Sequence, residues 1–166
     1  AIRRQRQMCI RDRYKTPPET EERRQEKKKS NKNQPQRLLL TWLVEHPEMY
    51  QYIRAYIGAD DFIEPLYHSV AIMLFEQLDN EEKINPAAIL SRFTDAEEQK
   101  EIAAIFNTHL KYGLSSEDED KALSDVVRKV KLASIEDEMV HTSDIVRWQE
   151  LLSLKNKMQK FSISRS

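Results

Sequence analysis

The chain has little glycine, little cysteine and no long hydrophobic run. Only two of its 166 residues are glycines, Gly58 and Gly113, so neither tight β-hairpins nor glycine-rich phosphate-binding loops are expected. The single cysteine, Cys9, excludes an internal disulfide and a zinc site built from several thiolates, and it favours a reducing compartment. The longest apolar runs, around residues 38–40 and 70–75, are far shorter than the roughly 20 residues of a membrane-spanning helix. No hydrophobic core follows the N-terminal arginines, so a cytoplasmic protein without a secretory signal is predicted.

Charge is distributed unevenly along the chain. Residues 1–33 contain 12 Lys/Arg and 5 Asp/Glu, whereas residues 34–166 contain 15 and 23. Because the basic part has almost no apolar periodicity, we predict a disordered linker over residues 1–33. Residues 7–13 resemble a translated sequencing adapter, so residues 1–13 are suspected of being non-native. A weak DNA contact through this segment is an open alternative to a plain solvated tether.

Beyond residue 34 the sequence predicts an all-α protein. Apolar residues recur with helical spacing, and proline, glycine and capping residues separate the segments. We predict a helical bundle over residues 34–116, followed by a long connecting helix and a C-terminal helical hairpin over residues 117–166. Helix starts are predicted at Pro47, at Asn85-Pro86, at a capping box over residues 94–97, and at a cap formed by Ser115 or Ser116.

The last 44 residues carry more apolar surface than two helices can cover for each other. On the long helix, one apolar face is centred on residues 123–130 and an opposite one on residues 132–139, so this helix is predicted to serve two bodies. The final helix carries two adjacent stripes, where about 100° of apolar surface suffices for one neighbour. The stripes are Ile145/Trp148/Leu152 and Leu151/Leu154/Met158/Phe161. We therefore predict that a partner covers part of this surface.

The sequence contains no recognisable active site. Glu138 and His141 form half of a di-iron carboxylate pattern, but no second Glu-x-x-His occurs. Glu64 and His68 are interpreted as a surface pair or a cap contact. The acidic residues 117–120 are interpreted as the first turn of a helix, where negative charge complements the helix dipole. We predict no catalytic residue, no metal ligand and no cofactor in this chain.

Two segments resemble known helical modules of DNA replication. Residues 36–48, Gln-Arg-Leu-Leu-Leu-Thr-Trp-Leu-Val-Glu-His-Pro-Glu, are similar to the opening shared by the C-terminal domain of bacterial DNA primase and the N-terminal domain of the replicative helicase. Residues 62–68, Phe-Ile-Glu-Pro-Leu-Tyr-His, resemble the entry to their third helix. The long helix leading to a terminal hairpin is similar to the primase module, because the helicase continues into a linker and an ATPase.

The resemblance to primase implies a role in recruitment rather than in chemistry. A primase C-terminal domain binds the N-terminal collar of the hexameric replicative helicase and so brings RNA primer synthesis to the replication fork in the bacterial nucleoid. The enzyme activity, DNA-directed RNA polymerisation, would belong to other domains of the parent chain. The predicted helicase-binding residues are Ile145, Trp148, Leu151, Leu154, Lys155, Met158 and Phe161, with Lys157 and Lys160 as further polar rim.

Two other functions are compatible with the sequence. The chain could be the collar domain of a replicative helicase, which would form oligomers without a partner. It could also be a helical nucleic-acid-binding module that uses the basic N-terminal arm, with a steep salt dependence of DNA affinity. A metal site at Glu138 and His141 is a weak third possibility that elemental analysis would test.

Overall fold

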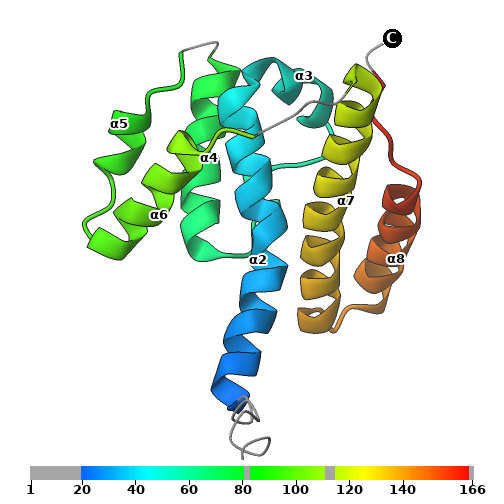
Figure 1. The fold of residues 1–166 in the computed structure, drawn as a ribbon. Helices are drawn as coiled ribbons and strands as arrows, with labels where there is room; N and C mark the ends of the chain where they lie inside the picture. Colours follow the sequence, from blue (N-terminus) through cyan, green and yellow to red (C-terminus); the bar gives the residue numbers. More distant parts are fainter. Residues whose placement is uncertain (1–19, 81–82, 111–114, 165–166) are drawn as a thin grey trace, which may run out of the picture. The chain divides into compact units, whose positions relative to one another are not determined.

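The computed structural model describes residues 20–80, 83–110 and 115–164, and their regular structure is entirely helical. The prediction of an all-α protein is therefore confirmed. By its internal contacts the chain divides into residues 1–31 and residues 32–166. The described α-helices are α2 (Glu21–Glu45), α3 (Tyr50–Ile53), α4 (Pro65–Asp79), α5 (Pro86–Leu90), α6 (Ala96–Asn107), α7 (Ser116–His141) and α8 (Ile145–Gln159), with short 3-10 helices η1 (Pro47–Met49) and η2 (Ala59–Asp61) (Figure 1).

Helix α2 begins well before the position expected from the sequence. It starts at Glu21 and contains Pro35, whereas the helical bundle was predicted to begin at residue 34. Residues 21–33, for which a disordered linker was predicted, are helical in the structure. Lys, Arg, Glu and Gln are good helix formers, and Glu21 and Glu22 complement the dipole of the first turn, so this stretch can be helical without burying a face. Residues 1–19, including the suspected non-native residues 1–13, lie outside the described residues.

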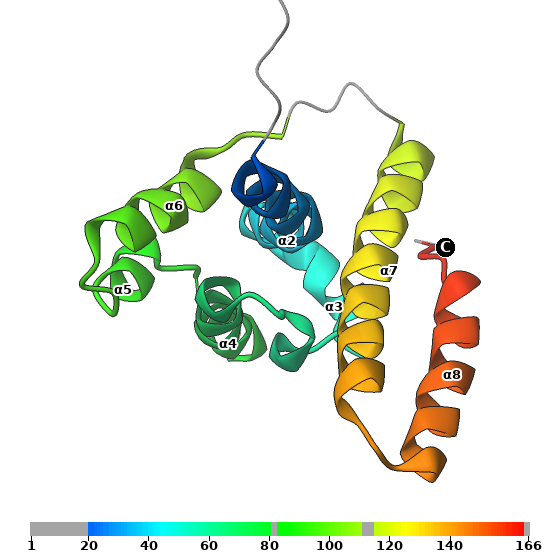
Figure 2. The ribbon, with the colours of Figure 1, turned by 90° about the horizontal axis from the view of Figure 1, so that it is seen from below.

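The main core of the second unit is formed by residues of α2 to α6 and of the first half of α7. In Figures 1 and 2, α3, α4 and the second half of α2 lie between the pair α5/α6 and the pair α7/α8. Helix α4 contributes Val70, Ala71 and Leu74, all fully buried, and α6 contributes Ile102 and Ile105. The core residues of α2 are Leu39, Leu40, Trp42 and Leu43. Most apolar side chains of residues 36–48, the segment on which the resemblance rests, therefore belong to the main core.

Two helix starts follow the predicted capping residues. The side chain of Asn85 accepts a hydrogen bond from the Ala88 amide (3.1 Å), and Ser115 caps α7 by accepting from the Asp118 amide (3.3 Å). The expected capping box at residues 94–97 is wrong by one position, because Asp95 accepts from the Glu98 amide (3.1 Å) and caps α6. Asp and Thr are both good caps, so the local sequence did not decide between them.

Candidate protein-interaction site

Helix α7 packs on two separate clusters of apolar side chains. Its first half enters the main core through Leu123, Val126, Val127 and Val130. Its second half contributes buried Ile135, with Leu132 and Met139, to a small second cluster shared with α8. Figure 2 shows α8 beside α7, on the side away from α4. The prediction that this helix serves two bodies is confirmed, and the second body is the hairpin itself.

Helix α8 has its own N-terminal cap and is connected to α7 by two ion pairs. Asp144 caps it by accepting a hydrogen bond from the Val146 amide (2.9 Å). Nε of Arg147 donates to Glu138 at 2.7 Å, and Nζ of Lys155 lies 2.9 Å from Glu136. Hydrogen bonds to Glu138 and Glu150 raise the pKa of the Arg147 guanidinium. Such exposed pairs add little stability.

The predicted helicase-binding residues divide between the interior and the surface of this hairpin. Leu151 and Met158 are buried against α7, and Leu154 and Phe161 are half-buried in the same cluster. Ile145 is 73% exposed and Trp148 is 42% exposed. Periodicity revealed both stripes of α8, but it gave no sign of which one faces α7. In this arrangement Leu151 and Met158 are not part of the exposed surface, and Lys155 is held by Glu136.

One apolar stripe of α8 is exposed in the part of the chain that the structure describes. We define the hairpin stripe as Ile145, Trp148 and Leu152, which follow the spacing i, i+3, i+7 on one helix face. Leu152, exposed to 38%, was recognised in this stripe from the sequence but was not among the predicted binding residues. Two further exposed valines lie near the hairpin corner, Val140 at the end of α7 and Val146 in the first turn of α8. Each directly follows a residue of an apolar stripe, Met139 or Ile145, but neither continues the helical spacing of that stripe.

The C-terminal strap, defined as residues 160–164, ties the end of α8 back to the bundle. Ile163 is buried in the main core, and its amide donates to the Ser124 hydroxyl of α7 at 2.8 Å. Arg128 donates from Nη2 to the Phe161 carbonyl at 2.7 Å. The Phe161 ring also contacts Tyr56, with 4.6 Å between ring centroids. Helix α8 is thus held in two ways, by its packing on α7 and by the strap that follows its last turn.

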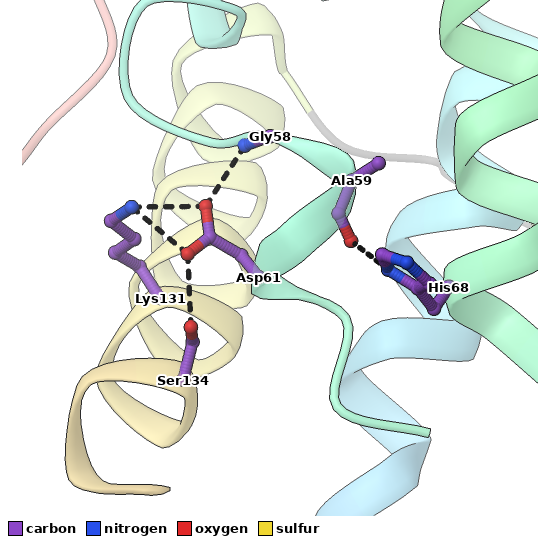
Figure 3. Close-up of polar contacts among 6 residues, drawn as sticks. All are labelled: Gly58, Ala59, Asp61, His68, Lys131 and Ser134. Atoms are coloured by element: carbon purple, nitrogen blue, oxygen red, sulfur yellow. Dashed lines mark hydrogen bonds and ion pairs between the residues drawn. The ribbon is translucent and has the colours of Figure 1, made fainter. Parts of the chain in front are cut away.

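A partly buried ion pair joins the η2 segment to the second half of α7 (Figure 3). Nζ of Lys131 lies 2.9 Å from both carboxylate oxygens of Asp61, and the Ser134 hydroxyl donates to Asp61 at 3.0 Å. The Gly58 amide also donates to Asp61 at 2.8 Å. Beside this cluster, Nδ1 of His68 is 2.8 Å from the Ala59 carbonyl oxygen. Between His68 and Glu64 the structure has the backbone contact of a cap, because the His68 amide donates to the carbonyl of the N-cap residue Glu64 at 2.8 Å. The Glu64 carboxylate accepts from Asn33 (2.7 Å).

The residues considered for metal binding have other partners. Glu138 accepts from Arg147, and Nδ1 of His141 is 2.7 Å from the Asp137 carbonyl oxygen. Asp118 accepts from the Ser115 hydroxyl (2.9 Å), in keeping with a role at the start of α7. Within residues 20–80, 83–110 and 115–164, no group of three or more His, Cys, Asp or Glu side chains is arranged to hold a metal ion.

Over the part that the structure describes, no helix has the length and apolar character needed to cross a bilayer. None of the protein-family models, curated proteins or solved structures with which the chain was compared matches it.

Proposed function

We propose that this chain is a protein-interaction domain of a bacterial DNA primase, which binds the N-terminal collar of the hexameric replicative helicase. In this role it recruits RNA primer synthesis to the cytoplasmic replication fork. The observation that carries the proposal is the hairpin stripe, an apolar surface on an anchored helix that stays exposed among the residues that the structure describes. The polymerase chemistry would belong to the rest of the parent protein.

The resemblance and the packing support the proposal in different ways. Residues 36–48 and 62–68 resemble the primase module, and their apolar side chains Leu39, Leu40 and Phe62 are buried, so this likeness concerns the scaffold. The hairpin stripe, by contrast, is the surface proposed to contact the helicase. Ile145, Trp148 and Leu152 form a cluster with one large aromatic residue, and Trp is the residue type most often found at energetic hot spots of interfaces.

Recruitment needs no catalytic group in this domain. Binding the helicase would hold the polymerase domain of the same chain near the unwound strand, and tethering raises its effective concentration there without any new contact to DNA. Lys157 and Lys160 are exposed near the end of α8, so they could contact an acidic rim and raise the association rate. The affinity would come mainly from the apolar stripe.

Calorimetric titration of the full chain with the host's replicative helicase tests the proposal. The variant Ile145→Ser/Trp148→Ala should bind about thirtyfold more weakly, which corresponds to a loss of about 2 kcal/mol from a hot spot. The matched control is Ile72→Ser, because Ile72 is a 47% exposed residue on α4 in the bundle. Both variants change exposed side chains and should keep the native melting temperature.

Three outcomes would contradict the proposal. Native affinity in the Ile145→Ser/Trp148→Ala variant would exclude the hairpin stripe as the binding surface. No binding by the native chain would exclude the helicase as its partner. Stable oligomers of the chain alone, measured by light scattering, would favour the helicase-collar alternative. Truncation after Asp144 is a poor substitute, because it also removes Ile163 from the main core.

A further inference from the structure

An open groove lies between the η2–α4 segment and the second half of α7. It has a volume of about 550 Å³ and is lined by residues of both walls. The first wall contributes Asp60, Phe62, Ile63, Pro65 and His68, and the second contributes Ser134, Asp137, Glu138 and His141. This acidic groove, as we call it, is distinct from the hairpin stripe, because none of the stripe residues lines it.

The shape of the acidic groove is fixed by buried contacts behind it. Asp61 of the first wall is bound to Lys131 and Ser134 of α7, so the two walls are joined directly. His68 is in turn bound to the Ala59 carbonyl, which holds η2 against α4. A ligand would therefore meet a preorganised surface and would not have to order it on binding.

The charge of the acidic groove is negative. The lining residues that the structure describes include three carboxylates and no lysine or arginine. Glu138 is neutralised by Arg147 at 2.7 Å, so Asp60 and Asp137, one on each wall, carry the remaining negative charge. Asp137 also lies 3.6 Å from Nδ1 of His141. Nucleic acid is disfavoured here, because its phosphates carry charge of the same sign.

The acidic groove also offers apolar surface between these charges. Ile63 is 40% exposed, Pro65 is exposed, and Phe62 lies buried beside them. Lysine and arginine side chains match such a surface, because their aliphatic stems cover apolar atoms while their charged ends reach carboxylates. An apolar side chain next to them could cover Ile63.

We propose that the acidic groove binds a basic amphipathic segment of a partner protein, with alternating Lys/Arg and apolar side chains. The cationic side chains contact Asp60 and Asp137, and an apolar side chain packs on Ile63. This surface is independent of the hairpin stripe, so the chain presents two binding faces, one apolar and one acidic.

Binding of labelled peptides to the full chain, measured by fluorescence anisotropy at about pH 8 where histidine is neutral, tests this proposal. A short peptide of alternating lysine and leucine should bind at least about tenfold more tightly than a glutamate–leucine or a lysine–glycine peptide. Raising the salt from about 0.1 M to about 1 M should weaken the binding, because the screening length falls to about 3 Å.

Variants locate the binding site. Asp60→Asn/Asp137→Asn and, separately, Ile63→Ser should each weaken the lysine–leucine peptide about tenfold. The matched control Glu97→Gln/Glu117→Gln removes the same charge from exposed positions outside the groove and should bind as the native chain does. Ile145→Ser/Trp148→Ala should also bind normally, which separates this site from the hairpin stripe.

The proposal is overturned by any of four results. These are absence of peptide binding, equal binding of the lysine–glycine peptide, native affinity in Asp60→Asn/Asp137→Asn, or loss of affinity only in Ile145→Ser/Trp148→Ala. The last result would place the basic peptide on the hairpin stripe.

Discussion

At the scale of single residues, Asp61 is the polar group on which the second half of α7 depends. It is 7% exposed and accepts hydrogen bonds from Lys131, Ser134 and the Gly58 amide. Burying both charges costs desolvation energy, so the pair itself adds little net stability. Removing one partner is costly, because the other charge stays buried without compensation.

Asp61→Asn should lower the free energy of unfolding by about 3 kcal/mol, because it leaves the Lys131 ammonium without its carboxylate. The double variant Asp61→Asn/Lys131→Met should recover part of that loss, since neither charge is then buried alone. Urea denaturation monitored by circular dichroism measures both effects. Glu138→Gln, which breaks the exposed pair with Arg147, is the control and should show no measurable change. A loss in Asp61→Asn no larger than in this control would contradict the assigned role of Asp61.

Two buried tyrosines make stability sensitive to alkaline pH. Burial raises the pKa of Tyr50 from 10.0 to about 12, and the nearby Asp79 carboxylate adds to the effect. Burial also raises the pKa of Tyr67, whose hydroxyl donates to Glu101 at 3.0 Å. Glu101 is paired in turn with Arg37 (2.9 Å), so this chain of contacts joins α4, α6 and α2.

The free energy of unfolding should fall as the pH rises from about 10 through about 12. The folded state favours the neutral tyrosines, so their contribution is fully present below the unfolded pKa of about 10 and is lost as the folded groups ionise. Tyr50→Phe should flatten this part of the pH profile, whereas the exposed Tyr52→Phe should leave it unchanged. Urea denaturation across this pH range measures the slopes. Equal slopes in the two variants would argue against a raised pKa at Tyr50.

At the scale of elements, the C-terminal strap determines how firmly α8 is held. Ile163 enters the core formed by distant helices, and its amide bonds Ser124, 39 residues earlier in the sequence. Nothing in the local sequence of residues 160–164 indicates this contact, since Ile163 is a lone apolar residue between serines. The starts of α5 and α7, by contrast, were predictable, because caps act within three or four residues.

Ile163→Ala should destabilise the chain by about 2–3 kcal/mol through the cavity that it leaves in the main core. Amide hydrogen exchange in α8 should also accelerate, because the helix loses its second anchor. Ser162→Ala, at an exposed neighbouring position, is the matched control and should change neither quantity. Unchanged exchange in α8 would mean that contacts with α7 alone hold the helix in place.

At the scale of the whole second unit, the two apolar clusters could unfold together or one after the other. The hairpin cluster contains Ile135, Leu151 and Met158, and Phe161 packs against both clusters. The predicted division into a bundle over residues 34–116 and a hairpin region over residues 117–166 stays a prediction. Packing does not follow it closely, because Leu123, Val127 and Ile163 belong to the main core.

Leu151→Ala should accelerate hydrogen exchange in α8 and in the second half of α7 while leaving α2 and α4 protected. Leu151 is buried in the small cluster, so its cavity weakens the local unit by about 3 kcal/mol. Leu74→Ala, in the main core, should instead lower protection throughout the second unit. A uniform effect of Leu151→Ala, measured by NMR, would show that bundle and hairpin unfold as one unit.

The sequence determined the features that depend on neighbours along the chain. Helical periodicity identified the two faces of α7 and the two stripes of α8, and the side chains of Asn85 and Ser115 marked helix starts. Only the tertiary structure decided which stripe of α8 is covered, because both stripes are apolar and equally helical. The same holds for Asp61, whose partner Lys131 lies 70 residues away. Such contacts leave no periodic trace in the sequence, since they depend on how separate helices pack in space.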